Sequence, residues 1–204
     1  MTREEDANTA SNRVKGLMKR AATWPGRNLG KPHPAGVPLF IVSAVFFALL
    51  LISPFLAERD TLHFGSGGKV GELDNEGNIS SIDDPFARAI YRFGDRYCHQ
   101  KDHRSYELNG NQMPVCARDI GLFLGIFLGC VLGSMYKRSI PLLVLGMFIL
   151  PMALDGGFQS LTAYESFNPL RLVTGAVGGL GIGLYLNGSL VHVLLILLRG
   201  RGKG

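Results

Sequence analysis

The chain has 204 residues, a formal net charge of +5 and a hydrophobic content of 47%. This length suits one compact unit rather than several large domains. Its basic residues cluster beside long uncharged blocks, which favours a role in membrane topology over nucleic-acid binding. We therefore expect no nucleic-acid partner and a lipid bilayer as the principal surroundings of the chain.

The first 36 residues carry seven lysines and arginines against three acids, and they contain several prolines. They show no sustained hydrophobic periodicity, so we expect a basic cytoplasmic tail over residues 1–36. A short amphipathic stretch in this tail would suit anionic lipid, although a plain topology signal explains the same composition.

Four hydrophobic segments are long enough to cross a bilayer. The first, 37–57, gives 21 residues without a charge. At about 1.5 Å per residue, this covers a hydrocarbon core of about 30 Å. The others cover 120–136, 140–158 and 172–198, and the last allows a tilt or a break near Asn187. The sequence predicts an all-α membrane protein whose four transmembrane helices form one membrane domain, 37–198.

Basic residues set the expected orientation. Lys137 and Arg138 occupy the turn between the second and third segments, and residues 199–204 form a basic end. With four spans, these groups share one side with the N-terminal tail, and the positive-inside rule makes that side cytoplasmic. We predict a multi-pass cell-membrane protein with both termini in the cytoplasm. Its loop 58–119, with eight basic and eleven acidic residues, then lies outside.

The outer loop begins as a glycine- and aspartate-rich linker that contains a glycosylation sequon at Asn78, whose use depends on the host. Asp83 or Asp84 can then cap a helix with Pro85 at its first position. Apolar residues follow at helical spacing: Phe86, Ile90, Phe93 and Tyr97. We expect an amphipathic helix that lies on the membrane surface or against the bundle.

Candidate metal ligands gather between this helix and the second span: Cys98, His99, His103, Cys116 and Asp119. The two histidines are four residues apart and share a face if the helix continues, while Cys116 and Asp119 have a ligand-x-x-ligand spacing. The set suits tetrahedral zinc. Three alternatives stay open, namely a structural disulfide between the two cysteines, a redox-active thiol pair and a solvated loop without a ligand.

Glycines recur every four residues in two spans. They are Gly121, Gly125, Gly129 and Gly133 in the second span, and Gly175, Gly179 and Gly183 in the fourth. Such small-residue faces let helix backbones approach closely in lipid. We expect these two spans to pack together, with their N-termini side by side at the outer surface.

This packing would gather polar side chains from several segments into one site. Helix N-termini and arginines favour an anion such as a lipid phosphate, a pyrophosphate or a carboxylate. The candidates are Arg104, Arg118, Gln159, Glu165, Asn168 and Arg171. Asp155 is the candidate catalytic residue, because a charge at membrane depth is costly unless it is partnered or used. An ion pair with Arg118 or Arg171 is the alternative role.

The stretches YCHQKDHRSYELNGNQMPVCARDIGLFLG and LDGGFQSLTAYESFNPLRLVTGAVGG resemble a small prokaryotic family of integral membrane proteins, domain of unknown function 2085 (DUF2085). The resemblance covers about residues 90–183 and includes Cys98, Cys116, Asp155 and Arg171. Asp119 departs from the pattern, because the family usually has a cysteine there. Carboxylate can replace thiolate on zinc but cannot join a dithiol relay, so the departure weakens a redox function at this position.

Two functions from different classes are consistent with these residues. The first is a membrane enzyme for an anionic lipid-linked substrate, in which a metal activates water and Arg118 and Arg171 hold phosphate. The second is a non-enzymatic transporter component or membrane scaffold with a structural disulfide between Cys98 and Cys116. The sequence sets no oligomeric state.

Overall fold

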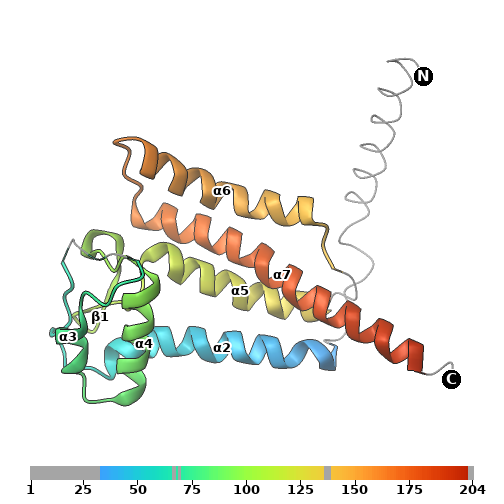
Figure 1. Ribbon diagram of the computed structural model, residues 1–204, viewed down its shortest axis with the longest axis horizontal. Coiled ribbons are helices and arrows are strands. Elements are labelled where there is room, and N and C mark those ends of the chain that lie inside the picture. The colour runs from blue at the N-terminus through green and yellow to red at the C-terminus, as the bar shows by residue number, and fades with distance from the viewer. Residues whose placement is uncertain (1–32, 66–67, 69, 136–138, 202–204) are drawn as a thin grey trace.

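The computed structural model describes residues 33–65, 68, 70–135 and 139–201, with side chains to residue 194. Most of the predicted basic tail, the turn with Lys137 and Arg138, and residues 202–204 lie outside the described residues. The described part consists of four long helices with a compact segment at one end, here called the polar cap and defined as residues 53–116 (Figure 1).

Four helices are long and apolar enough to cross a membrane, which confirms the predicted fold class. α2 (Val37–Ile52) is flanked by the 3-10 turns η1 (Pro34–Gly36) and η2 (Ser53–Phe55). The other three are α5 (Ala117–Met135), α6 (Leu142–Leu161) and α7 (Asn168–Arg201). α5 and α7 begin three and four residues before the predicted spans, because their first turns carry polar residues.

α7 is the longest helix and continues without a break past Asn187. Its 34 residues span about 51 Å at about 1.5 Å per residue, which is longer than a hydrocarbon core of about 30 Å. The side chain of Asn187 is fully buried, and its Nδ2 donates hydrogen bonds to the carbonyl oxygens of Gly36 and Cys130. This amide joins α7 to α5 and to the start of α2 at the end away from the cap.

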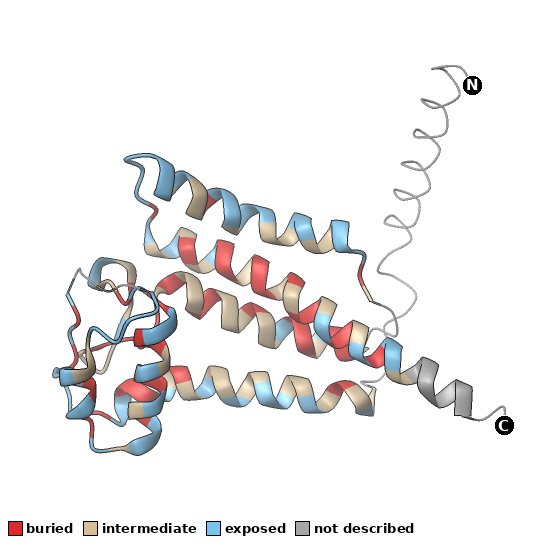
Figure 2. Cartoon of the chain, in the orientation of Figure 1, coloured by how far each residue is buried: buried red, intermediate tan, exposed pale blue. Residues whose placement is uncertain are grey.

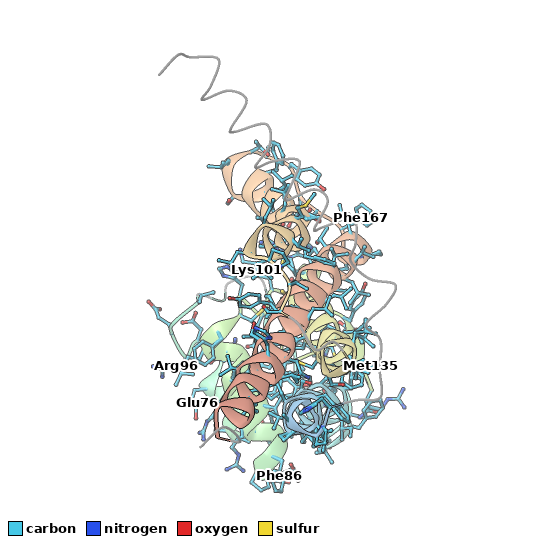
Figure 3. The ribbon with its side chains drawn as sticks, turned by 90° about the vertical axis from the view of Figure 1, so that its right-hand side faces the viewer. Glu76, Phe86, Arg96, Lys101, Met135 and Phe167 are labelled. Atoms are coloured by element: carbon cyan, nitrogen blue, oxygen red, sulfur yellow. The ribbon has the colours of Figure 1, made fainter. Side chains whose placement is uncertain are left out.

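The four helices lie side by side in one row, in the spatial order α2, α5, α7 and α6 (Figures 1 and 3). α5 and α7 are the central pair, and most buried positions of the bundle fall on these two helices (Figure 2). α6 packs against α7 and is mostly exposed, as Leu143 and Met147 illustrate. Exposed apolar side chains on long apolar helices imply a lipid bilayer as their surroundings.

The central pair packs through its glycines. A Cβ atom at Gly121 or Gly125 would overlap a backbone carbonyl oxygen of α7, and one at Gly175 would overlap the carbonyl oxygen of Arg118 on α5. The same holds along the seam for Gly129, Gly179 and Gly183. The two backbones are in direct contact here, because no larger residue would fit. This contact brings the N-terminal ends of α5 and α7 together beside the cap.

Besides η2, the cap contains two short helices, a second 3-10 turn and a two-stranded ribbon. These are α3 (Glu76–Ser80), α4 (Pro85–Tyr97), η3 (Asp102–Arg104), β1 (Glu107–Leu108) and β2 (Asn111–Gln112), and the two strands pair antiparallel. α4 starts at the predicted residue, with the Asp84 carboxylate accepting from the Ala87 backbone N–H at 2.8 Å. The helix crosses the end of the bundle (Figure 1), and Phe93 packs edge-on against Phe46 of α2.

Buried side-chain amides hold the irregular parts of the cap. Gln112 accepts from the Phe64 N–H at 3.0 Å, and Asn111 accepts from the Leu62 N–H at 3.0 Å. Gln100 donates to the carbonyl oxygen of Pro114 at 2.7 Å. Buried backbone groups need partners, and these amides supply them where sheet pairing is short. The amides therefore fix the two chain segments that carry Cys98 and Cys116.

Candidate functional site

Two cysteines and an aspartate meet where the cap joins α5. Cys98 follows the last residue of α4, Cys116 precedes α5, and Asp119 lies in the first turn of α5. The Cys116 backbone N–H donates to the Cys98 Sγ at 3.2 Å, and the Cys116 thiol donates to the Asp119 carboxylate at 3.3 Å. One ligand atom from each of the three residues lies within 4.8 Å of the other two.

This donor set could hold a metal ion. With Zn–S bonds of about 2.3 Å, tetrahedral geometry places ligand atoms about 3.8 Å apart. The three ligand atoms lie at most 4.8 Å apart, so each distance between them would have to shorten by about 1 Å or less for all three to bind one zinc ion. Three protein ligands would leave a fourth position for water or a substrate, as in catalytic zinc sites. Asp119 also carries its charge in the first turn of α5, where the helix dipole favours a carboxylate.

The two candidate histidines lie apart from this cluster. α4 ends at Tyr97, and Gln100 has a positive φ of 41°, so His99 and His103 do not continue one helical face. His99 is exposed, and its Nδ1 lies 3.4 Å from the carbonyl oxygen of Gly68. His103 instead contacts Asp102, with 3.0 Å between the His103 Nδ1 and a carboxylate oxygen.

Both cysteines of the cluster carry free thiols, and Cys98 is buried, with 5% of the residue exposed. A hydrogen bond with Cys116, burial and the nearby charge of Asp119 raise the pKa of Cys98 above that of an ordinary thiol. The thiol is therefore protonated at neutral pH when no cation is bound. A coordinated cation would replace this proton, since thiolate is the form that binds metal.

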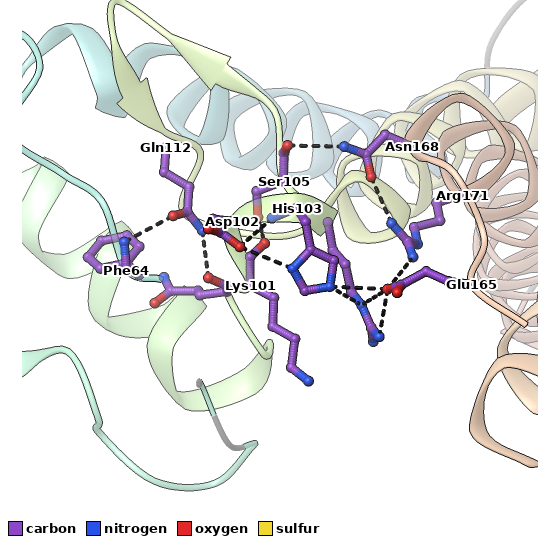
Figure 4. A network of polar contacts seen from close by, with 11 residues as sticks. Phe64, Lys101, Asp102, His103, Ser105, Gln112, Glu165, Asn168 and Arg171 are labelled. Atoms are coloured by element: carbon purple, nitrogen blue, oxygen red, sulfur yellow. Dashed lines mark hydrogen bonds and ion pairs between the residues drawn. The ribbon is translucent and has the colours of Figure 1, made fainter. Parts of the chain in front are cut away.

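Glu165, in the connection between α6 and α7, contacts basic side chains of the cap and of α7 (Figure 4). Its Oε1 lies 3.0 Å from Arg104 Nη2, 3.1 Å from His103 Nε2 and 3.4 Å from Arg171 Nη2. The hydrogen bond from Arg104, more than the other charges, lowers the pKa of Glu165 below that of a free glutamate. The carboxylate joins the cap to α7.

Asn168, the first residue of α7, strengthens this junction. Its Oδ1 accepts from Arg171 at 2.9 Å, and its Nδ2 donates to the Ser105 carbonyl oxygen at 3.1 Å (Figure 4). Arg171 is 2% exposed and interacts electrostatically with Cys116 and Arg118. The guanidinium therefore contacts Asn168 and Glu165, and its positive charge also acts on Cys116.

A second ion pair connects α5 with α6. Arg118 Nη2 donates to the Asp155 carboxylate, and the same nitrogen lies 3.3 Å from Gln159 Oε1. The Asp155 side chain is 5% exposed, which matches the ion pair given above as the alternative to catalysis. Asp155 also interacts with Ser166 and Arg171, so the connection after α6 closes over this pair.

Two polar atoms at this place have no partner within the described chain. They are the buried Nε atoms of Arg118 and Arg171, whereas the equally buried Asp155 carboxyl group and Ser166 hydroxyl are close enough to pair with each other. Native proteins satisfy nearly all such atoms with protein, water or ligand. Ser166 was not among the residues expected at the site. The sequence shows a serine in the stretch ESFN but does not show that it is buried, because its burial depends on how the α6–α7 connection folds back.

The segment that carries these residues is similar to a family of membrane proteins. Residues 98–185 match the family described as "Predicted membrane protein (DUF2085)". The chain is 33% identical over 102 residues to an uncharacterized protein of Methanothermobacter thermautotrophicus, covering 48% of this chain and 90% of that relative. The chain belongs to the DUF2085 family. The matched segment runs from Cys98 into α7, so it contains the cysteine cluster and both ion-pair networks but not α2.

A longer match in the same comparison is the uncharacterized protein MJ1492 of Methanocaldococcus jannaschii. It is 29% identical over 152 residues, covering 72% of this chain and 89% of the relative. No solved structure matches the chain. The DUF2085 description states a membrane protein, in agreement with the four apolar helices, and carries no reaction.

Proposed function

We propose that the protein is a metal-dependent membrane enzyme that acts on an anionic, lipid-linked substrate. The observation that carries this proposal is the position of Cys98, Cys116 and Asp119, whose ligand atoms lie within 4.8 Å of one another, in the field of the buried Arg171 guanidinium. Two soft sulfur donors and one carboxylate favour zinc over magnesium or calcium. A cation next to fixed positive side chains suits hydrolysis or transfer at a phosphate or carboxylate.

Each part of the site has a role in this chemistry. Cys98, Cys116 and Asp119 would hold the cation, which would supply Lewis-acid activation of a water molecule at neutral pH. Arg171 and Arg118 would orient the anionic group, aided by the N-terminal ends of α5 and α7. Asp155 would take or return a proton at its carboxylate, which is held by the ion pair with Arg118 and by the Ser166 hydroxyl.

Metal analysis of the purified protein tests the first step. We expect about one zinc per chain in the wild type and less than a tenth of that in Cys98→Ala/Cys116→Ala. Cys130→Ala is the matched control, because Cys130 is buried in α5 away from the cluster, and it should keep the metal. Equal metal content in the wild type and the double variant would contradict the proposal.

The second candidate function is a non-enzymatic scaffold or transporter component stabilised by a disulfide. It is supported by the closeness of the two cysteines, since the Cys116 backbone N–H donates to the Cys98 sulfur at 3.2 Å. A disulfide over a loop of this size would contribute about 3 kcal/mol to stability. Mass spectrometry of protein purified without reductant would find Cys98 and Cys116 joined and metal absent if this candidate were correct.

We also propose that the cap faces the outside of the cell membrane and that both termini lie in the cytoplasm. The proposal is supported by the basic residues that the sequence places in the tail, in the turn between α5 and α6, and at the chain end. Arg59→Cys introduces a thiol at an exposed cap position. A membrane-impermeant maleimide added to intact cells should label this variant and leave the wild type unlabelled. Labelling only after lysis would reverse the orientation.

A further inference from the structure

An aromatic stripe runs along one face of α4. At about 100° per residue, Phe86, Phe93 and Tyr97 lie within about 40° of one another around the helix axis. The middle of the stripe packs against the bundle. The ring centroid of Phe93 lies 5.1 Å from that of Phe46 on α2 and 6.2 Å from that of Phe123 on α5. The face of α4 that carries the three rings is therefore turned towards the membrane-spanning helices.

The described chain leaves both ends of this stripe open. Phe86 is 67% exposed and Tyr97 is 63% exposed, although they share a face with Phe93. In Figure 3, Phe86 lies beyond α2, at the edge of the row of helices. Ile90 is 8% exposed, because it packs with Leu50 of α2 between the two ends. The aromatic ends of α4 therefore extend past the helices that its middle contacts.

The level of the stripe along the bundle indicates what surrounds these ends. Phe123 lies six residues after Ala117, where α5 begins. Phe46 lies six residues before Ile52, where α2 ends. At about 1.5 Å per residue, the contact with Phe93 is about 9 Å inside the ends of both helices. A hydrocarbon core of about 30 Å takes up the whole length of α5, so the stripe reaches into the hydrocarbon on the cap side. Lipid is what lies beside the bundle at this level.

The other faces of α4 suit an interfacial helix. Asp95 is buried in the cap, where its carboxylate accepts from the Asn75 Nδ2 at 2.8 Å. Arg92 and Arg96 are exposed and lie about 120° and 80° around the helix from Phe86. Interfacial helices turn aromatic residues towards the acyl chains and carry arginine or lysine on the polar side, where the charges meet lipid phosphates.

We propose that α4 is an interfacial membrane helix. Phe86 and Tyr97 insert among the acyl chains of the cap-side leaflet, and Arg96 lies at the level of the headgroup phosphates. The bundle supports the middle of the helix, and lipid covers its two ends. Cys98 directly follows Tyr97, so the same helix holds the cysteine cluster at the membrane interface. The inference uses neither a bound metal nor an enzymatic activity, and it holds for either orientation of the chain.

Depth-dependent fluorescence quenching tests the insertion. The chain contains one tryptophan, Trp24, so Trp24→Phe gives a background for Phe86→Trp or Tyr97→Trp. The full chain is reconstituted in phosphatidylcholine vesicles whose acyl chains carry bromine either near the headgroup or near the chain end. We expect each tryptophan on α4 to lose at least half of its emission with the shallow bromines and less with the deep ones. Aqueous iodide should quench neither.

Gly77→Trp on α3 is the matched control within the cap. Gly77 is exposed, a Cβ there meets no atom within 4 Å, and α3 lies on the far side of α4 from the bundle (Figure 1). This tryptophan should be quenched by iodide and not by brominated lipid. Equal bromine quenching of Gly77→Trp and Phe86→Trp would overturn the proposal. Protection of Phe86→Trp from both quenchers would also overturn it, because a protein surface would then cover the stripe.

Photolabelling of the unmodified chain needs no variant and guards against misfolding. A membrane-partitioning aryl diazirine should label Phe86 and Tyr97 to within threefold of Leu143, an exposed residue of the spanning helix α6. It should label them at least fivefold more than the residues of α3. Labelling of Phe86 no stronger than that of α3 contradicts the proposal.

The interfacial helix and the metal-dependent function fail separately. In the Cys98→Ala/Cys116→Ala background, Phe86→Trp should be quenched by brominated lipid as in the chain with both cysteines. Bromine quenching in a protein that contains no metal would support the interfacial helix and reject the metal-dependent function alone. Bound metal without bromine quenching would reject the interfacial helix alone.

Discussion

α7 makes two very different contacts with its neighbours. Towards α5 it forms a seam in which glycines let the two backbones touch, so a single methyl group would collide with a carbonyl oxygen. Towards α6 it forms a looser contact that leaves a groove of about 470 Å³ and a polar connection through Arg118 and Asp155. The first contact gives the site its fixed geometry, and the second leaves room for a ligand.

The largest expected effect comes from closing the space in the central seam. Gly125→Leu should prevent α5 and α7 from packing, because its Cβ alone would overlap the Ala176 carbonyl oxygen. We expect a loss of more than about 4 kcal/mol in the free energy of unfolding, enough to prevent recovery of folded protein. Gly146→Leu is the matched control on α6, where a Cβ meets no atom within 4 Å. Equal yields of monodisperse protein from both variants would contradict direct backbone contact between α5 and α7 at Gly125.

Removing one partner of the α5–α6 ion pair should have an intermediate effect. Arg118→Met leaves the Asp155 carboxylate buried without its cation, which costs about 3 kcal/mol. Replacing both partners, in Arg118→Met/Asp155→Leu, should recover most of that loss because no charge stays buried. The free energy of unfolding in mixed micelles measures both changes. If the double variant were less stable than Arg118→Met, the ion pair would contribute more to stability than the mutual neutralisation of two buried charges.

The smallest expected effect concerns the carboxylate that joins the cap to α7. Arg104 lowers the pKa of Glu165, so its stabilising contribution is present above the ordinary glutamate pKa of about 4.3 and is lost as the pH falls through the lowered value. Glu165→Gln should therefore melt slightly below the wild type at pH 7 and together with it near pH 3. Glu107→Gln, at an exposed position of β1, is the control and should melt with the wild type at both.

The sequence predicted those features that depend on local patterns. Uncharged runs located the four spans, and Asp84 followed by Pro85 located the start of α4. Glycine spacing pointed to contact between α5 and α7 because lipid-exposed helices have few other ways to approach closely. Helix ends were less predictable, since first turns tolerate polar residues such as Arg118 that end a hydropathy pattern.

Features that depend on chain reversal did not follow from the sequence. The four-residue spacing of His99 and His103 predicts a shared face only if α4 continues, but the chain turns at Gln100. The roles of Gln100 and Gln112 as backbone partners depend on loops up to 48 residues away in sequence. The burial of Ser166 likewise depends on tertiary packing, which no local sequence pattern indicates.

The single row of helices determines how a molecule would reach the site. In a closed ring of helices, a ligand has to pass through a pore or a gap that opens between neighbours. In this row, α6 stands at one edge and the groove beside it meets the hydrocarbon phase directly. A lipid would therefore arrive by lateral diffusion, so its encounter rate would depend on its surface density in the bilayer rather than on its concentration in water.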